Sequence, residues 1–266
     1  MLHYYMPTGL ISGSGLYEIE GLKLECEKFV STPYGDPSSP YKLGMVDNTP
    51  LVFLPRHGSP HSIPPHKVNY RANIWGLKSL GIDRIIAVTA VGSIDPDIRP
   101  GSIIIPDQII DSTYGAREST FYDAGKVVHV DFTEPYCSEI RSSMISAALK
   151  TGINIYQEGT YICVNGPRLE TAMEIEFFKK TGANIVGMTA MPEAVLAREL
   201  EICYCGICIV TNFAAGITDK KLTTTEVIET MKASSEKLRQ LLKTVFAEIP
   251  ENRSCGCKDA LKDSGL

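Results

Sequence analysis

The stretch that decides the fold reads LVFLPRHGSPHSIPPHKVNYRAN and runs from Leu51 to Asn73. Its first four residues are apolar and predict a short buried strand, which ends at the pair Arg56-His57. Helical spacing of apolar residues over 68–80 predicts that the loop leads into a helix. In open α/β sheets, ligands bind where strands end and loops begin. A cationic, proline-stiffened loop at such a place suits an anion such as phosphate, although an Arg-His pair that only caps a strand end would look the same.

Composition limits the class of protein. The chain has 266 residues, 44% hydrophobic content and a net charge of −5, which predicts one large α/β domain. Without a long basic run, nucleic acid and anionic membranes are poor partners. The first residues lack a basic segment followed by an apolar core, and no apolar run approaches the roughly 20 residues that span a bilayer. We therefore expect a cytoplasmic protein.

Apolar runs and helical periodicities alternate along the chain. The strands predicted from these patterns are 42–46, 49–54, 84–93, 103–111, 159–164, 184–189 and 202–211. The later predicted helices are 138–150, 172–180, 191–200 and 223–246. This order predicts a single α/β domain over residues 1–250, with a mixed central β-sheet flanked by helices. Residues 112–136 form a long aromatic-bearing loop, and 251–266 form a polar tail that we expect to be mobile.

Polar groups suited to a ligand recur in loops that follow strands. They are Ser14, Arg56-His57, Thr89-Ala90, Glu170, Met188-Thr189 and Asn212. Each has a structural explanation: the glycine-rich turn around Ser14 is equally consistent with a plain tight turn, and Glu170 with an acid at a helix start. Because six such loops share hydroxyl, cationic or amide groups, we expect one composite site.

The eight cysteines do not predict a metal site. Six lie in apolar stretches and are interpreted as small core residues: Cys26, Cys137, Cys163, Cys203, Cys205 and Cys208. None has the C-x-x-C spacing of a zinc site, and the last three alternate along one predicted strand, so they should not converge. In the tail, Cys255-Gly256-Cys257 is consistent with a local disulfide, a redox pair or two exposed thiols.

Five ordered motifs resemble those of the purine nucleoside phosphorylase and methylthioadenosine phosphorylase family. They are Pro55-Arg56-His57-Gly58 with His61; Lys67-Val68-Asn69-Tyr70; Thr89-Ala90-x-Gly92-Ser93; Asn165-Gly166-Pro167-Arg168-x-Glu170-Thr171; and Gly187-Met188-Thr189-x-x-Pro192-Glu193. The resemblance covers about residues 8–246. It implies a nucleoside phosphorylase-like fold and reversible phosphorolysis of a nucleoside to free base and pentose 1-phosphate in purine salvage. It further implies phosphate as co-substrate, no metal or organic cofactor, and a homo-oligomer that is a trimer or a dimer of trimers.

The resemblance also implies roles for individual residues. The phosphate-binding set is Ser14, Arg56, His57, Thr89, Ala90 and Thr189. Met188 would pack under the sugar, and Asn212 would act in catalysis by stabilising the leaving purine as N7 takes a proton. Phe213 and Ala214 would lie at the base. His129 matches a position that reaches into a neighbouring subunit's site in trimeric members, but an ordinary surface histidine explains it equally well.

Two positions predict which base is bound. Members of the family that act on 6-aminopurines carry an aspartate where this chain has Asn212 and a second acidic residue where it has Ala214. A 6-oxopurine presents acceptors at O6 and N7, to which the Asn212 amide can donate, and an N1–H donor that suits the Glu170 carboxylate. We therefore expect inosine and guanosine as substrates.

The 5′ end of the sugar is left open by the sequence. Leu222 and Thr224 lie in the relevant segment, but they do not separate a 5′-hydroxyl from a 5′-methylthio group. S-methyl-5′-thioinosine, or methylthioadenosine, therefore stays an alternative substrate. A nucleoside hydrolase and a purine-binding regulatory protein with an inactive site are less consistent with the full phosphate-binding set.

Overall fold

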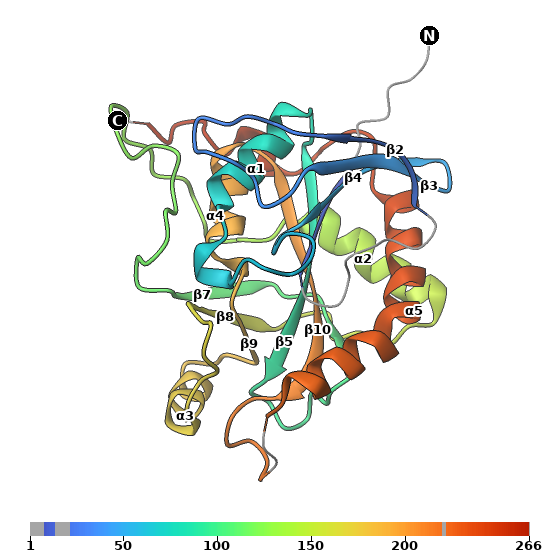
Figure 1. The fold of residues 1–266 in the computed structure, drawn as a ribbon, viewed down its shortest axis with the longest axis vertical. Helices are drawn as coiled ribbons and strands as arrows, with labels where there is room; N and C mark the ends of the chain where they lie inside the picture. The colour runs from blue at the N-terminus through green and yellow to red at the C-terminus, as the bar shows by residue number, and fades with distance from the viewer. Residues whose placement is uncertain (1–7, 14–21, 220–221, 266) are drawn as a thin grey trace.

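The computed structural model describes residues 8–13, 22–219 and 222–265, and its centre is a ten-stranded mixed sheet (Figure 1). Eight strands follow the order β2-β3-β4-β1-β5-β9-β8-β7, while β10 pairs with β5 and β6. Their bounds are β1 Thr8–Ser12, β2 Leu22–Lys28, β3 Tyr41–Val46, β4 Thr49–Pro55, β5 Arg84–Ser93, β6 Ile103–Ile104, β7 Gln108–Ser112, β8 Thr160–Val164, β9 Ile185–Gly187 and β10 Cys203–Phe213. The strands β1, β4, β5 and β10 are mutually parallel.

Helices cover both faces of this sheet, as the sequence predicts. On one side α1 (Tyr70–Ser79) packs against α4 (Ala190–Glu199), and on the other α2 (Ser138–Thr151) packs against α5 (Thr224–Glu248) (Figure 1). The short α3 (Ala172–Lys180) follows β8, and two 3₁₀ turns lie at Pro65–Lys67 and Gly256–Asp259. Each α-helix lies within two residues of its predicted bounds, because its apolar spacing matches the face it buries.

Three expectations about the fold are wrong. The run 103–111 is not one strand: it breaks around Pro106, which has no N–H for a ladder, into β6 against β10 and β7 beside β8. Cys26 is exposed rather than in the core, because it lies on the edge strand β2. The tail after Pro250 packs against the domain, since Arg84 Nη2 donates to the carbonyls of Pro250 and Glu251 at 2.7 and 2.9 Å.

A gap on one edge of β5 positions the site. The strand β10 pairs along the whole of β5, whereas the opposite edge is shared by β1, which reaches Val88, and β9, which begins its pairing at Gly92. Neither strand pairs with Thr89, Ala90 or Val91 on that edge. Because alternate residues present their N–H and C=O groups to the same edge, the Ala90 N–H points the same way as the Val88 carbonyl, which accepts from Gly13 N at 3.2 Å.

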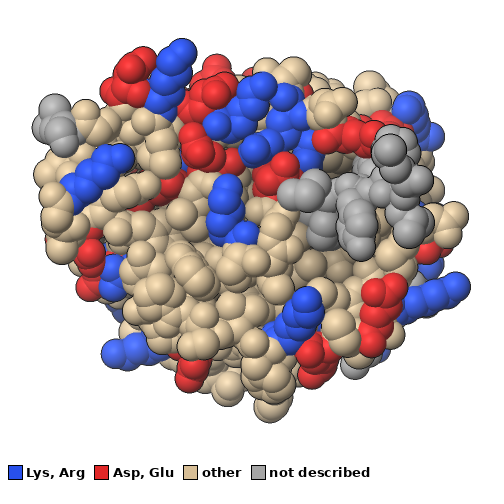
Figure 2. Space-filling model, turned by 90° about the horizontal axis from the view of Figure 1, so that it is seen from above, with Lys and Arg blue, Asp and Glu red and all other residues tan. Residues whose placement is uncertain are grey.

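The surface carries charges of both signs. On the face drawn in Figure 2, Lys and Arg are interspersed with Asp and Glu around a broad uncharged area. Among the described residues, no helix is long and apolar enough to cross a membrane.

Candidate active site

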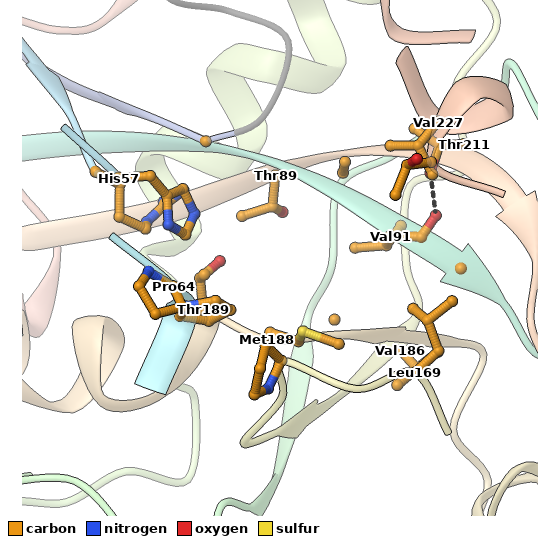
Figure 3. Close-up of a pocket in the computed structure, with 18 of the residues that line it drawn as sticks. His57, Pro64, Thr89, Val91, Leu169, Val186, Met188, Thr189, Thr211 and Val227 are labelled. Atoms are coloured by element: carbon orange, nitrogen blue, oxygen red, sulfur yellow. Dashed lines mark hydrogen bonds between the residues drawn. The ribbon is translucent and has the colours of Figure 1, made fainter. Parts of the chain in front are cut away.

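A cavity of about 470 Å³ opens at the gap in β5. Figure 3 shows His57, Thr89, Met188 and Thr189 around it, with Thr211 and Val227 at its far end. Nine of the residues that the sequence assigns to a site line this cavity: Arg56, His57, Thr89, Ala90, Glu170, Met188, Thr189, Asn212 and Thr224. They come from six separate segments of the chain, so residues far apart in the sequence meet at one cavity.

Five other assigned residues are not placed in this cavity. Ser14 lies outside the described residues. Phe213, Leu222 and Ala214 do not line the cavity, and Ala214 is buried in a small apolar cluster. His129 borders a different cavity, beside the C-terminal tail, where its backbone N–H donates to the Ser264 carbonyl at 2.8 Å.

Arg56 is fully buried and held by a carboxylate that the sequence does not single out as a site residue. Its Nε donates to Glu193 Oε1 and its Nη2 to Oε2 at 2.9 Å, while the Tyr204 hydroxyl donates to Oε2 at 3.0 Å. Burial by itself lowers the pKa of Arg56, but the facing Glu193 outweighs this and holds the pKa above its ordinary value. Nη1 donates to the Val88 carbonyl at 3.2 Å and lies beside Gly13, where an added Cβ would be only 2.8 Å away. The charged fork is therefore fixed in place, with Nη1 nearest the cavity.

His57 is a neutral imidazole at pH 7. Burial and the neighbouring Arg56 lower its pKa to about 3. Its Nδ1 lies 2.8 Å from the Ile63 carbonyl, which can only accept, so Nδ1 carries the proton and Nε2 has a free lone pair. His61 stacks on the ring at a centroid distance of 4.4 Å. We expected His57 to be a donor to phosphate, whereas this tautomer makes Nε2 an acceptor.

Two hydroxyl groups face each other across the gap. Thr89 Oγ1 lies 3.3 Å from the buried Cys208 thiol, and the Thr189 N–H donates to the Tyr161 hydroxyl at 3.3 Å, which orients Thr189. Since the Cys208 thiol can donate to Thr89, the Thr89 hydroxyl hydrogen stays available for a ligand. With the Ala90 N–H, these groups form a ring of donors beside Arg56.

Met188 lies on the floor of the cavity because a glycine makes room for it. A Cβ at Gly166 would be 2.5 Å from Met188 Sδ, and Gly166 has φ +65°, which favours glycine. The long, flexible thioether thus presents an apolar surface between the donor ring and the opposite end of the cavity.

A β-bulge directs Asn212 into the cavity. The pairing of β10 with β5 shifts between Val210 and Asn212, so Thr211 and Asn212 both line the cavity instead of facing opposite sides of the sheet. The Thr211 hydroxyl lies 2.9 Å from Asn212 Oδ1, and Nδ2 donates to the Phe213 carbonyl at 2.9 Å. Because that carbonyl can only accept, the amide orientation is fixed, and the second N–H of Nδ2 is left for a ligand.

Glu170 does not serve as the helix-start acid. The capping box of α3 is made by Thr171 and Glu174, whose carboxylate accepts from the Thr171 N–H at 2.7 Å. The Glu170 side chain instead lines the cavity, and burial raises the pKa of its carboxyl, with Glu174 adding to the shift. Arg168 opposes this shift, but its guanidinium donates to the Glu174 carboxylate at 2.7 and 2.8 Å, so the Glu170 carboxylate can accept from a ligand donor.

Arg117 is a further residue that sequence reasoning missed. It lies in the irregular loop after β7, yet its guanidinium is buried and donates to the carbonyls of Met191 and Asn165, the latter at 2.8 Å. It thus holds together the two segments that carry Thr189 and Glu170. Its position in a long polar loop gives no sequence signal for this role.

The comparisons with known proteins agree with this geometry. The model of the phosphorylase superfamily matches residues 7–247, and the chain belongs to that family. It is 57% identical over 261 residues to a probable S-methyl-5′-thioinosine phosphorylase of Thermodesulfovibrio yellowstonii, covering 98% of each chain. It is 50% identical to the 6-oxopurine nucleoside phosphorylase of Pyrococcus furiosus, covering 97% of this chain and 98% of the relative.

A solved structure extends the likeness to three dimensions. The methylthioadenosine phosphorylase of Schistosoma mansoni in complex with adenine has a TM-score of 0.91 and 35% identity, over 97% of this chain and 96% of the other. The mixed sheet flanked by helices is thus the fold of nucleoside phosphorylases. The chain is a pentosyltransferase of the purine nucleoside phosphorylase family.

Proposed function

We propose that the chain catalyses reversible phosphorolysis of 6-oxopurine nucleosides, inosine and guanosine, to the free base and ribose 1-phosphate. One observation carries this proposal: a fixed amide donor, Asn212, and a carboxylate acceptor, Glu170, line the same cavity as the donor ring. Phosphate is a co-substrate in this reaction, and no resident cofactor is part of the proposed chemistry.

Phosphate would occupy the donor ring. The Thr89 and Thr189 hydroxyls and the Ala90 N–H would donate to its oxygens, while Arg56 supplies a fixed positive charge through Nη1. A phosphate that keeps one proton can donate it to the bare Nε2 of His57. Because these groups are held by contacts behind them, little reorganisation is needed when the anion binds.

The sugar would lie over Met188, between phosphate and base. As the bond from C1′ to the purine breaks, positive charge develops on the ribosyl group, and the bound phosphate stabilises that charge and then attacks C1′ from the face opposite the base. Holding the two reactants together in one cavity contributes the orientation that a bimolecular encounter lacks. The departing electron pair goes to the purine, where the Asn212 amide stabilises the negative charge until N7 takes a proton from solvent.

The base would be read at its two edges. The free N–H of Asn212 donates toward O6 and N7, which are both acceptors in a 6-oxopurine. Glu170 accepts from N1–H, and in guanine from the exocyclic amine as well. Adenine has a donor at position 6 and no N1–H, so the contacts with O6 and with N1–H would be lost and only N7 would remain as an acceptor.

A second substrate, 5′-methylthioinosine, is favoured by two observations. The side of the cavity at the start of α5 carries the apolar Val227 beside Thr224, and an apolar wall suits a methylthio group. The relative from Thermodesulfovibrio yellowstonii, at 57% identity, has that probable activity. The hydroxyl of Thr224 suits a 5′-hydroxyl instead, so both substrates belong in the assay.

We also infer a homo-oligomer, a trimer or a dimer of trimers. Large exposed apolar side chains line a second cavity, which shares Glu170 with the active-site cavity; they include Tyr114 at 86%, Met173 at 74% and Phe177 at 59%. A contiguous apolar patch of this kind is typical of a subunit contact. Light scattering of the purified chain tests this inference.

The experiment that tests the proposed function is release of free base from inosine, guanosine, adenosine, methylthioadenosine and methylthioinosine, each with and without phosphate. Release that depends on phosphate, from inosine, guanosine or methylthioinosine but not from the 6-amino substrates, is expected. Release without phosphate would identify a hydrolase, and release from adenosine in preference to inosine would contradict the proposed roles of Asn212 and Glu170.

A further inference from the structure

Four cysteines that are far apart in the sequence meet at one point, away from the active site. The Sγ atoms of Cys137, Cys203, Cys255 and Cys257 all lie within 4.8 Å of one another. Cys137 immediately precedes α2, Cys203 is the first residue of β10, and the other two belong to the C-terminal tail. Three of the four are buried and Cys255 is half-buried.

The backbone around the thiols is fixed by other contacts. The Cys137 N–H donates to the Tyr204 carbonyl at 2.8 Å, which joins the start of α2 to β10. The Ser254 N–H donates to Glu139 Oε1 at 2.8 Å, and the Ser254 hydroxyl donates to the same oxygen. The tail therefore approaches α2 through polar contacts that do not involve sulfur, and the thiols converge as part of a built site.

The spacing of the sulfurs suits a tetrahedral metal. Four thiolates around one zinc ion at about 2.3 Å are about 3.8 Å from one another. The sulfur–sulfur distances in the cluster lie on both sides of this value: Cys203 and Cys255 are 3.3 Å apart, and no two of the four sulfurs are more than 4.8 Å apart. No disulfide joins these four cysteines in the structure, so all four sulfurs can act as ligands.

The surroundings provide compensating charge and a route for an ion. The Arg253 guanidinium, whose Nε lies 3.2 Å from Asp83 Oδ2, also interacts with Cys203, where it would balance part of the negative charge of a tetrathiolate centre. A cavity of about 500 Å³ borders Cys137, Cys255 and Cys257. Its lining carries four carboxylates, Asp131, Glu134, Asp259 and Asp263, against two cationic side chains, Arg198 and Lys262, so the excess charge is negative and favours a cation.

We propose that Cys137, Cys203, Cys255 and Cys257 bind one soft divalent metal ion of the zinc class and thereby tie the C-terminal tail to α2 and β10. All four positions around the metal are filled by protein, as in structural zinc sites, so the ion takes no part in the reaction. The proposal is independent of the substrate. The sequence predicts no metal site because Cys137 and Cys203 are isolated, and because Cys255 and Cys257 are separated by one residue instead of the two residues of a C-x-x-C motif.

The test is metal and thiol content of the full chain, produced with zinc in the medium and purified without oxygen or chelator. We expect about one zinc per chain by elemental analysis. Cys257→Ser and Cys203→Ser should lose most of it, while Cys26→Ser, at an exposed cysteine far along the chain, should keep it. Cobalt substituted for zinc in the wild-type chain should give the thiolate charge-transfer and tetrahedral ligand-field bands of a four-sulfur site, which tests the site even if a variant fails to fold.

Three results would overturn the proposal. The first is a wild-type chain without zinc that shows eight reactive thiols after denaturation, which would mean that the cluster binds nothing. The second is a metal-free chain with four reactive thiols, rising to eight only after reduction, which would mean that the cluster forms two disulfides. Zinc retained at the wild-type level in both Cys203→Ser and Cys257→Ser would likewise contradict it. With the metal bound, removal by a strong chelator should lower the melting temperature of the wild-type chain but not change that of Cys257→Ser.

Discussion

Replacing Asn212 by aspartate tests how the base is recognised. In the native site Asn212 Nδ2 donates to the Phe213 carbonyl at 2.9 Å, and Oδ1 faces the Thr211 hydroxyl at 2.9 Å. In Asn212→Asp the Thr211 contact survives, but the donor to the purine is replaced by a carboxylate oxygen. That oxygen would face the O6 and N7 acceptors of a 6-oxopurine.

The expected loss follows from one missing donor and one new repulsion. Together they remove about 2–4 kcal/mol of transition-state binding, which lowers kcat/KM for inosine about 30- to 1,000-fold. For adenosine the carboxylate accepts from the 6-amino group, so kcat/KM should rise and the ratio of adenosine to inosine activity should increase by more than the loss on inosine alone. The unpaired Phe213 carbonyl also costs about 1–3 kcal/mol of stability.

The assay is phosphate-dependent base release from both nucleosides over a range of pH. Asn48→Asp is the matched control, because it adds the same charge at an exposed turn between β3 and β4. An Asn212→Asp enzyme that keeps its native preference for inosine, with a normal melting curve, would refute the reasoning. An Asn212→Asp enzyme that regains inosine activity only at acid pH would support the reasoning, since the protonated carboxyl group can donate a hydrogen bond again.

Three further substitutions probe the groups around this contact. Glu170→Gln should lower kcat/KM for inosine about 10- to 150-fold, the range for a hydrogen bond to a charged group. Because burial raises the Glu170 pKa, the folded chain holds that proton more tightly than the unfolded chain, so the ionised carboxylate lowers stability at neutral pH and this loss disappears as pH falls. The melting temperature of Glu170→Gln should therefore equal or exceed the wild-type value at pH 7, and the difference should shrink in acid. A large drop in melting temperature at pH 7 would contradict this. Glu193→Gln breaks the buried pair with Arg56 and should lower the free energy of unfolding by about 3–5 kcal/mol, which lowers the melting temperature by about 6–20 °C. It should also raise the KM for phosphate. The control Glu236→Gln, in an exposed pair, should change neither quantity. Gly13→Ala places a Cβ 2.8 Å from Arg56 Nη1 and should raise the KM for phosphate about 10-fold, since overpacking costs about 1–3 kcal/mol; an unchanged KM would show that Nη1 does not face phosphate.

Much of the candidate site is predictable because its residues follow strands. Arg56, Thr89, Met188 and Asn212 each come at or near the end of an apolar run, and the edge of a sheet gathers such positions. The prediction fails where a long-range contact sets the role. The donor role expected for His57 depended on its charge, and only the buried position beside Arg56 and the contact of Nδ1 with the Ile63 carbonyl reveal the neutral tautomer.

Glu193 and Arg117 illustrate the same limit. Glu193 stands in a recognisable motif, but its bond to Arg56 joins residues 137 positions apart. Arg117 lies in a loop that composition describes as polar and irregular, although its guanidinium is buried among carbonyl groups. Neither partner leaves a local pattern, because periodicity reports which face of an element is buried and not which distant group it meets.

The sequence by itself determined the alternation of strands and helices, the bounds of α3, the strand-end placement of the phosphate and base groups, and the family. These properties are local or are carried by short ordered motifs. Only the tertiary structure decided the gap between β1 and β9 that exposes the Ala90 N–H, the bulge that turns Asn212 into the cavity, and the meeting of Cys137, Cys203, Cys255 and Cys257. Each of these depends on the register between strands or on the path of the chain in space, and both are set by the packing of the whole domain.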